Sequence, residues 1–70
     1  MSVNQLVLAE DVRAGDDIRF LGVFHRVLEI TEHPKPLSWP FDWDTYRVAH
    51  GPDDWTYALL PGQAVEVIRS

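Results

Sequence analysis

The strongest strand pattern in the chain is the run Val23-Phe24-His25-Arg26-Val27-Leu28-Glu29-Ile30. It is rich in β-branched and aromatic residues and contains neither glycine nor proline, which is typical of a β-strand. Alternate side chains of a strand point to opposite faces, and here neither face is purely polar. We therefore predict a central strand in a tightly curved sheet, partly covered on both sides.

Shorter strand patterns precede this run. Residues 5–9 and 17–21 have the composition and alternation of strands. Residues 10–16 have the composition of a turn in which Gly15 is free to adopt a positive φ. Gly22 then separates the second of these strands from the central run.

The C-terminal half returns to alternation. Residues 45–50 and 55–59 are predicted to form a hairpin around a turn at 51–54, with Tyr46 and Val48 on the core face. After a tight turn, residues 64–68 form the last predicted strand, with Val65 and Val67 pointing inward.

The segment from about Thr31 to Asp44 interrupts the strands. Pro34, Pro36 and Pro40 remove three backbone donors, which excludes a central strand or a helix interior. A loop of this length is uncommon in so small a domain, and such loops are often functional. We therefore predict one long loop that carries the binding chemistry.

These patterns predict one all-β domain over residues 1–70. The segments Asp11–Asp16, Gly22–Ile30 and Pro61–Val67 resemble the SH3-like barrels, including the KOW-type subset found in ribosome-associated proteins. The resemblance implies a small five-stranded SH3-like barrel with one long aromatic loop.

The order of strands and turns also resembles the N-terminal barrel of bacterial elongation factor P and its eukaryotic relatives, over most of the chain. That family carries a modified lysine in a Pro-Gly-Lys-Gly-type loop, whereas this chain reads His33-Pro34-Lys35-Pro36-Leu37. Because no glycine flanks Lys35, we take the fold from the resemblance and not the function. Lys35 is expected to be an ordinary exposed loop residue.

Composition limits the class of protein. Of 70 residues, 46% are apolar and none is cysteine, which indicates a globular domain without disulfides or thiolate metal sites. The net charge is −5, with 6 scattered basic residues, whereas nucleic-acid binders normally show a basic face. No apolar stretch approaches the roughly 20 residues that span a bilayer, and the N-terminus lacks a signal-peptide pattern. We therefore expect a cytoplasmic protein that does not bind membranes.

Aromatic and acidic residues in and near the long loop form the candidate binding site. In one interpretation, most of the rings cap an open end of the barrel and complete its small core. In the other, two or three rings line a groove for a proline-rich segment or a methylated lysine, and Trp39 and Trp43 are partly exposed. The candidate binding residues are Trp39, Phe41, Asp42, Trp43, Asp44, Trp55 and Tyr57.

Signatures of catalysis are absent from the sequence. His25, His33 and His50 lack the close spacing of a zinc motif, so we expect structural or surface roles, with pH sensitivity as an alternative. The sequence contains no nucleophile elbow or phosphate-binding loop. We predict no catalytic residues, no metal site, no cofactor and no enzymatic activity.

The sequence thus favours a non-enzymatic protein-interaction module. We expect a small accessory or regulatory protein of bacterial or phage origin that docks on a protein partner, or on itself, through the aromatic and acidic loop surface. Two other classes remain open. One is a KOW-like nucleic-acid- or ribosome-associated protein, with an acidic nucleic-acid mimic as its variant. The other is a small hydrolase or metal-dependent enzyme.

Overall fold

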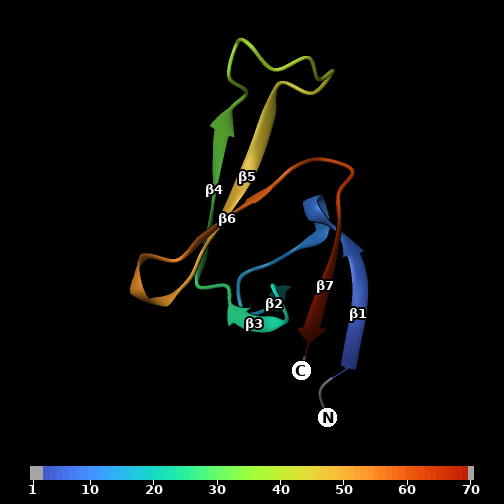
Figure 1. Cartoon of the computed structure of the whole chain (residues 1–70), viewed down its shortest axis with the longest axis vertical. Coiled ribbons are helices and arrows are strands. Elements are labelled where there is room, and N and C mark those ends of the chain that lie inside the picture. The colour runs from blue at the N-terminus through green and yellow to red at the C-terminus, as the bar shows by residue number, and fades with distance from the viewer. Residues whose placement is uncertain (1–2, 70) are drawn as a thin grey trace.

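Residues 3–69, which the computed structural model describes, form two antiparallel sheets (Figure 1). The first has the order β1 (Val3–Leu8), β7 (Ala64–Arg69), β2 (Asp17–Phe20), β3 (Val23–Arg26). The second has the order β4 (Glu29–Pro34), β5 (Thr45–His50), β6 (Thr56–Leu59). Single 3₁₀ turns follow β1 (Ala9–Asp11) and β5 (Pro52–Asp54). The protein is all-β as predicted, but the two sheets do not close, so the five-stranded barrel is not confirmed.

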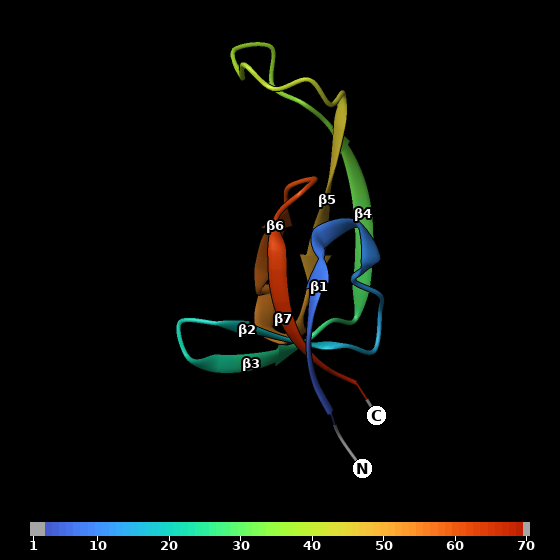
Figure 2. The same ribbon diagram turned by 90° about the vertical axis from the view of Figure 1, so that its right-hand side faces the viewer.

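The central run bends from one sheet into the other instead of forming one strand. At the bend, the N–H of Val27 donates to the carbonyl of Asp16 and that of Leu28 donates to the carbonyl of His50, both at 2.8 Å. β3 ends at Arg26 and β4 begins at Glu29. The two residues between them are therefore hydrogen-bonded in turn to the chain next to the first sheet and to the second sheet. Figure 2 shows the result: the β2–β3 hairpin runs across the direction of β4 and β5.

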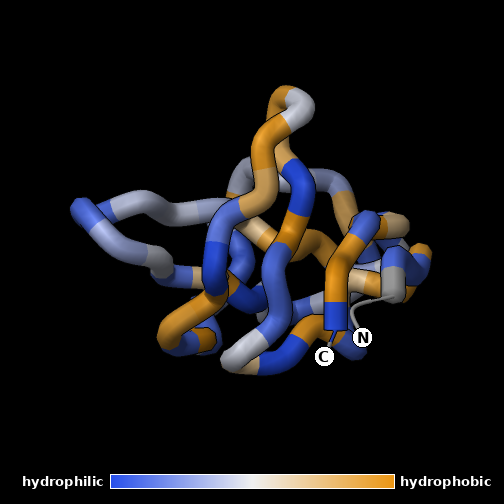
Figure 3. The backbone as a smooth tube through the Cα atoms, turned by 90° about the horizontal axis from the view of Figure 1, so that it is seen from below, coloured by the Kyte–Doolittle hydropathy of each residue, from blue (hydrophilic) through white to orange (hydrophobic). Residues whose placement is uncertain are grey.

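The β2–β3 hairpin closes through a tight turn. Leu21 and Gly22 both have positive φ, 52° and 80°, as in the two-residue turns that fit the twist of a hairpin. This conformation ends β2 at Phe20, one residue before the predicted end. The tip of the hairpin is apolar, and the tube projecting at the top of Figure 3 is largely coloured as hydrophobic.

The core lies between the inner faces of the sheets. Val65 and Val67 point inward as predicted, but Ala49 is the buried residue of β5, so placing Tyr46 and Val48 on the core face was wrong. Ala49 pairs with Ile30 on one side and Tyr57 on the other, and these larger side chains fill the space around it. The buried apolar residues are Ala9, Val12, Ile18, Val27, Ala49, Leu59, Val65 and Val67.

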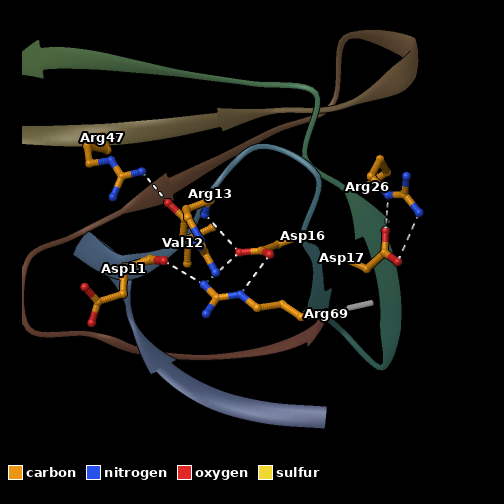
Figure 4. A network of polar contacts seen from close by, with 8 residues as sticks. All are labelled: Asp11, Val12, Arg13, Asp16, Asp17, Arg26, Arg47 and Arg69. Atoms are coloured by element: carbon orange, nitrogen blue, oxygen red, sulfur yellow. Dashed lines mark hydrogen bonds and ion pairs between the residues drawn. The ribbon is translucent and has the colours of Figure 1, made fainter. Parts of the chain in front are cut away.

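Asp16 is the buried charge that joins three parts of the chain (Figure 4). Its carboxylate accepts hydrogen bonds from Nε and Nη2 of Arg69, at 2.9 and 3.0 Å, and from the N–H of Arg13 at 2.9 Å. Its carbonyl accepts the Val27 N–H at the bend between the sheets. Arg69 also donates to the carbonyl of Asp11 at 2.7 Å. The last strand, the connection before β2 and the bend are thereby fixed together.

The Asp16 contacts also set its protonation. Burial raises the pKa of this carboxyl, but the hydrogen bonds from Arg69 and Arg13 outweigh burial and hold the pKa below its ordinary value of 3.8. A group whose pKa is lower in the folded state stabilises the fold above its unfolded-state pKa. That contribution is lost as the pH falls through the folded-state value.

We expect Asp16→Asn to lower the free energy of unfolding by about 2 kcal/mol at neutral pH, because it weakens three hydrogen bonds to a buried group. Asp17→Asn is the matched control, since the pair of Asp17 with Arg26 is partly exposed and its loss is expected to be clearly smaller. Urea unfolding at pH 7 and pH 3 measures both variants. Equal losses at pH 7, or an Asp16→Asn variant as acid-sensitive as the native chain, would contradict this assignment.

Candidate functional site

The predicted long loop is shorter than the sequence indicated. β4 continues through Pro34, which pairs with Thr45, so the loop covers residues 35–44. Pro34 is tolerated because β4 is an edge strand of its sheet and Pro34 is its last residue. The loop and the strand ends project from the rest of the molecule in Figures 1 and 2. We call residues 33–46 the arm.

Aromatic rings form a cluster inside the arm. Phe41 and Trp43 stack with their centroids 5.1 Å apart and their planes 10° from parallel. Trp39 meets both rings edge-on at 6.0 Å. Tyr46 lies 5.7 Å from Trp39 and 6.1 Å from Trp43, and His33 lies 5.8 Å from Tyr46. The rings of the arm therefore pack on one another.

Strand alternation explains why this cluster is separate from the core. Tyr46 and His33 are opposite one another on β5 and β4, on the face that points away from Ala49 and the core. None of the arm rings is among the side chains that pack against the buried core, which are Val7, Ile30, Trp55 and Tyr57. The arm therefore has its own small apolar cluster.

Lys35 holds the loop in shape. Its backbone N–H donates to the carbonyl of Asp44 at 2.8 Å, and its Nζ donates to the carbonyl of Phe41. The N–H of Trp39 donates to the carbonyl of Pro36 at 3.0 Å. The expectation that Lys35 is simply an exposed loop residue was wrong, because it is half-buried and bonded across the loop.

Trp55 and Tyr57 belong to a second aromatic cluster on the core side. Trp55 stacks on His25 at 4.3 Å and lies nearly parallel to Tyr57 at 6.0 Å, and Phe20 meets Tyr57 edge-on at 5.2 Å. These contacts join the β2–β3 hairpin to β6. Trp55 also packs closely on the backbone of Gly51, where an added Cβ would lie 2.9 Å from its Cε3.

The seven residues predicted to bind thus divide into two groups. Trp39, Phe41 and Trp43, with the exposed Asp42 and Asp44, lie together in the arm. Trp55 and Tyr57 pack against the core instead. Phe20 and His25 of the second cluster were missed by sequence reasoning. Both residues lie in predicted strands next to charged residues, which indicated that their side chains could be partly buried. The pattern did not indicate which side chains they would contact.

The arm presents a projecting apolar surface rather than a groove. Leu37 is fully exposed at 103% and Phe41 is 45% exposed, whereas Trp39 and Trp43, which contact the Phe41 ring, are half-buried. The stacked rings of Phe41 and Trp43 touch, which leaves no space between them for a cation. Pro36, Ser38, Pro40, Asp42 and Asp44 are also exposed in this loop.

Two depressions lie on the surface of the described residues. A depression of about 180 Å³ beside Arg47 and Leu59 and an open one of about 290 Å³ beside Asp16 and Arg69 both fall below the volumes usual for small-molecule sites. Arg47 itself donates to the carbonyls of Ala9, Glu10 and Val12 and joins β5 to the turn after β1.

The histidines have contacts within the chain. The Thr31 hydroxyl oxygen lies 2.7 Å from Nε2 of His33 and 2.8 Å from Nε2 of His50, whereas His25 stacks on Trp55. Within residues 3–69, no group of three or more histidine, cysteine, aspartate or glutamate side chains is arranged to hold a metal ion. The same residues include no helix with the length and apolar character needed to cross a membrane.

Comparison of the chain with protein-family models, curated protein sequences and solved structures gives no match. The candidate site is therefore defined by its geometry: a ring cluster that stiffens a projecting arm with an exposed apolar and acidic tip.

The two clusters predict different effects on stability. We expect Trp55→Ala to lower the free energy of unfolding by about 3 kcal/mol, because this ring packs on the core, on His25 and on Gly51. Trp43→Ala is the matched control and is expected to cost about 1 kcal/mol or less, since it loosens the arm without opening the core. Denaturant unfolding followed by circular dichroism measures both. A loss for Trp43→Ala as large as that for Trp55→Ala would contradict the separation of the clusters.

Proposed function

We propose that the protein is a non-enzymatic interaction module whose arm binds a protein partner. The observation that carries this proposal is the exposure of Leu37 and Phe41 at the tip of a segment that projects away from the core. Apolar side chains gathered at one exposed place mark interaction surfaces, and aromatic residues dominate the binding energy of such surfaces.

The construction of the arm supports insertion into a partner. The ring cluster and the Lys35 hydrogen bonds order the loop before it binds, which reduces the conformational entropy lost on association. Leu37 and Phe41 would enter an apolar pocket of the partner. Asp42 and Asp44, exposed in the same loop, would face basic residues at the rim of that pocket.

The disposition of the basic side chains supports a protein partner over a nucleic acid. Five of the six basic residues donate to carboxylates or carbonyls of the chain itself, and the total charge is −5. Phosphate binding draws its affinity from cations that are free to replace counterions. The five are Arg19, Arg26, Lys35, Arg47 and Arg69.

The order of the strands supports a second part of the proposal, that the fold is related to the SH3-like barrels. β2, the bent β3–β4 run, β5 and β6 follow one another as a meander, and β7 returns to pair with β2. We infer an open variant of the barrel, extended by β1 and by the arm. A small cytoplasmic accessory or regulatory protein of bacterial or phage origin is the role that this proposal implies.

Affinity capture from a lysate of the organism that encodes the chain tests the proposal. We expect Leu37→Asp and Phe41→Asp each to reduce recovery of the partner by about tenfold or more, because a charge would have to enter its apolar pocket. Asp42→Asn and Asp44→Asn are expected to weaken binding less and to reduce its salt dependence.

Leu28→Asp is the control, since Leu28 is 60% exposed at the bend between the sheets and lies outside the arm. Circular dichroism verifies that each variant is folded. If folded Leu37→Asp and Phe41→Asp variants recover the same partner as fully as Leu28→Asp does, the arm is not the binding surface.

A further inference from the structure

A second surface lies at the opposite edge of the first sheet. β1 is its terminal strand and pairs with β7 along its whole length, from Val3 opposite Arg69 to Leu8 opposite Ala64. Among residues 3–69, no other strand lies beside β1 on the side away from β7 (Figure 1). Leu6 and Leu8 are 73% and 46% exposed on this strand. β1 therefore offers unpaired backbone groups together with apolar side chains.

The free edge of β1 lacks the features that normally prevent edge-to-edge pairing. Exposed edge strands are usually protected by charges, proline, bulges or short length. β1 has six residues, Val-Asn-Gln-Leu-Val-Leu, with no charge and no proline. The other edge strands have such features. β3 has only four residues and includes Arg26. β4 carries Glu29, Glu32 and Pro34, and β6 has only four residues, with Asp54 and Pro61 close to its ends.

The charges of the chain permit a second copy to bind at this edge. The chain carries −5, so two copies repel wherever their charged surfaces meet. β1 is neutral, and the nearby Glu66 is paired with Arg19 at 3.2 Å. The edge is thus a place where two copies can approach with little repulsion. We propose that two copies of this chain associate by antiparallel pairing of β1 with β1 around a two-fold axis.

Side-chain alternation and the positions of the leucines together determine the register that we propose. Residues opposite one another must point to the same face of the joined sheet, which excludes the register that would overlap all six residues. Two registers overlap five residues: residues 3–7 with Gln5 opposite Gln5, and residues 4–8 with Leu6 opposite Leu6 of the second copy. The second brings apolar side chains together and is the one that we propose. Two leucines that are exposed in the monomer then form a cross-strand apolar pair. The same contact is made from both sides, as in isologous dimers.

Sedimentation equilibrium over about a hundredfold range of concentration tests the pairing. One short strand per copy forms a small interface, so we expect a dimer that dissociates on dilution. Leu6→Lys is expected to weaken dimerisation by about tenfold or more, because it places two charges opposite one another. Leu28→Lys, at a comparably exposed leucine away from β1, is expected to dimerise like the native chain. Circular dichroism verifies that both variants are folded.

A native chain that is monomeric throughout this range, or equal effects of Leu6→Lys and Leu28→Lys, would overturn the proposal. Phe41→Asp separates it from the function assigned to the arm. This variant is expected to leave the dimer unchanged, and its dissociation would assign self-association to the arm instead.

Disulfide trapping tests the register independently of affinity. The chain contains no cysteine, so a single introduced thiol reports on one position. We expect Leu6→Cys to form a disulfide-linked dimer under mild oxidation about tenfold faster or more than Leu28→Cys, because residues opposite one another across paired strands bring their Cβ atoms within disulfide reach. Equal rates for the two variants would contradict pairing at Leu6.

Discussion

The hydrogen bonds of the buried Asp16 connect the segments from which the two sheets are built. A chain of 70 residues without cysteine has few large apolar side chains to bury and no covalent cross-link. Asp16 compensates by accepting hydrogen bonds from Arg13 and Arg69 through its carboxylate and from Val27 through its carbonyl. These bonds hold together the segments that must meet for the central run to pass from one sheet to the other. Arg47 provides a second clamp, from β5 to the turn after β1.

These hydrogen bonds fix the two sheets relative to each other, and the aromatic residues then have two roles. Trp55 and Tyr57 fill the space between the β2–β3 hairpin and β6 and contribute to stability. Trp39, Phe41 and Trp43 order an arm that contributes little to the core, so the exposed tip can be specialised for recognition without cost to the fold. The arm and the free edge of β1 are distinct surfaces, so the proposed protein partner and the proposed second copy would be bound independently.

Local sequence patterns predicted most of the strands, because alternation and glycine-containing turns are properties of neighbouring residues. Val65 and Val67 were placed inward correctly for this reason. The bend at Val27 and Leu28 could not be predicted, because neither glycine nor proline marks it and its hydrogen bonds go to Asp16 and His50, which are distant in the sequence. The phase of β5 was wrong because Arg47, a charged residue, lies on the inner face, where distant carbonyls accept its hydrogen bonds.

Only the part of the candidate site whose residues are neighbours in the sequence was predicted correctly. Trp39, Phe41 and Trp43 are close in sequence and also in space, so their grouping required no tertiary information. Trp55 is equally aromatic, but which face of the second sheet it occupies depends on the register of β5 and β6. Sequence alone therefore combined two clusters that the fold separates.

We propose that the arm serves recognition and that the rest of the chain folds without the arm's loop, residues 35–44. Replacing residues 35–44 by Asn-Gly, a two-residue turn suited to joining paired strands, tests this claim directly. Denaturant unfolding of the shortened chain is the measurement. The structure predicts one cooperative transition with a free energy of unfolding within about 1 kcal/mol of that of the full chain. A shortened chain that is unfolded, or that loses several kcal/mol, would show that the arm is part of the core and contradict the claim.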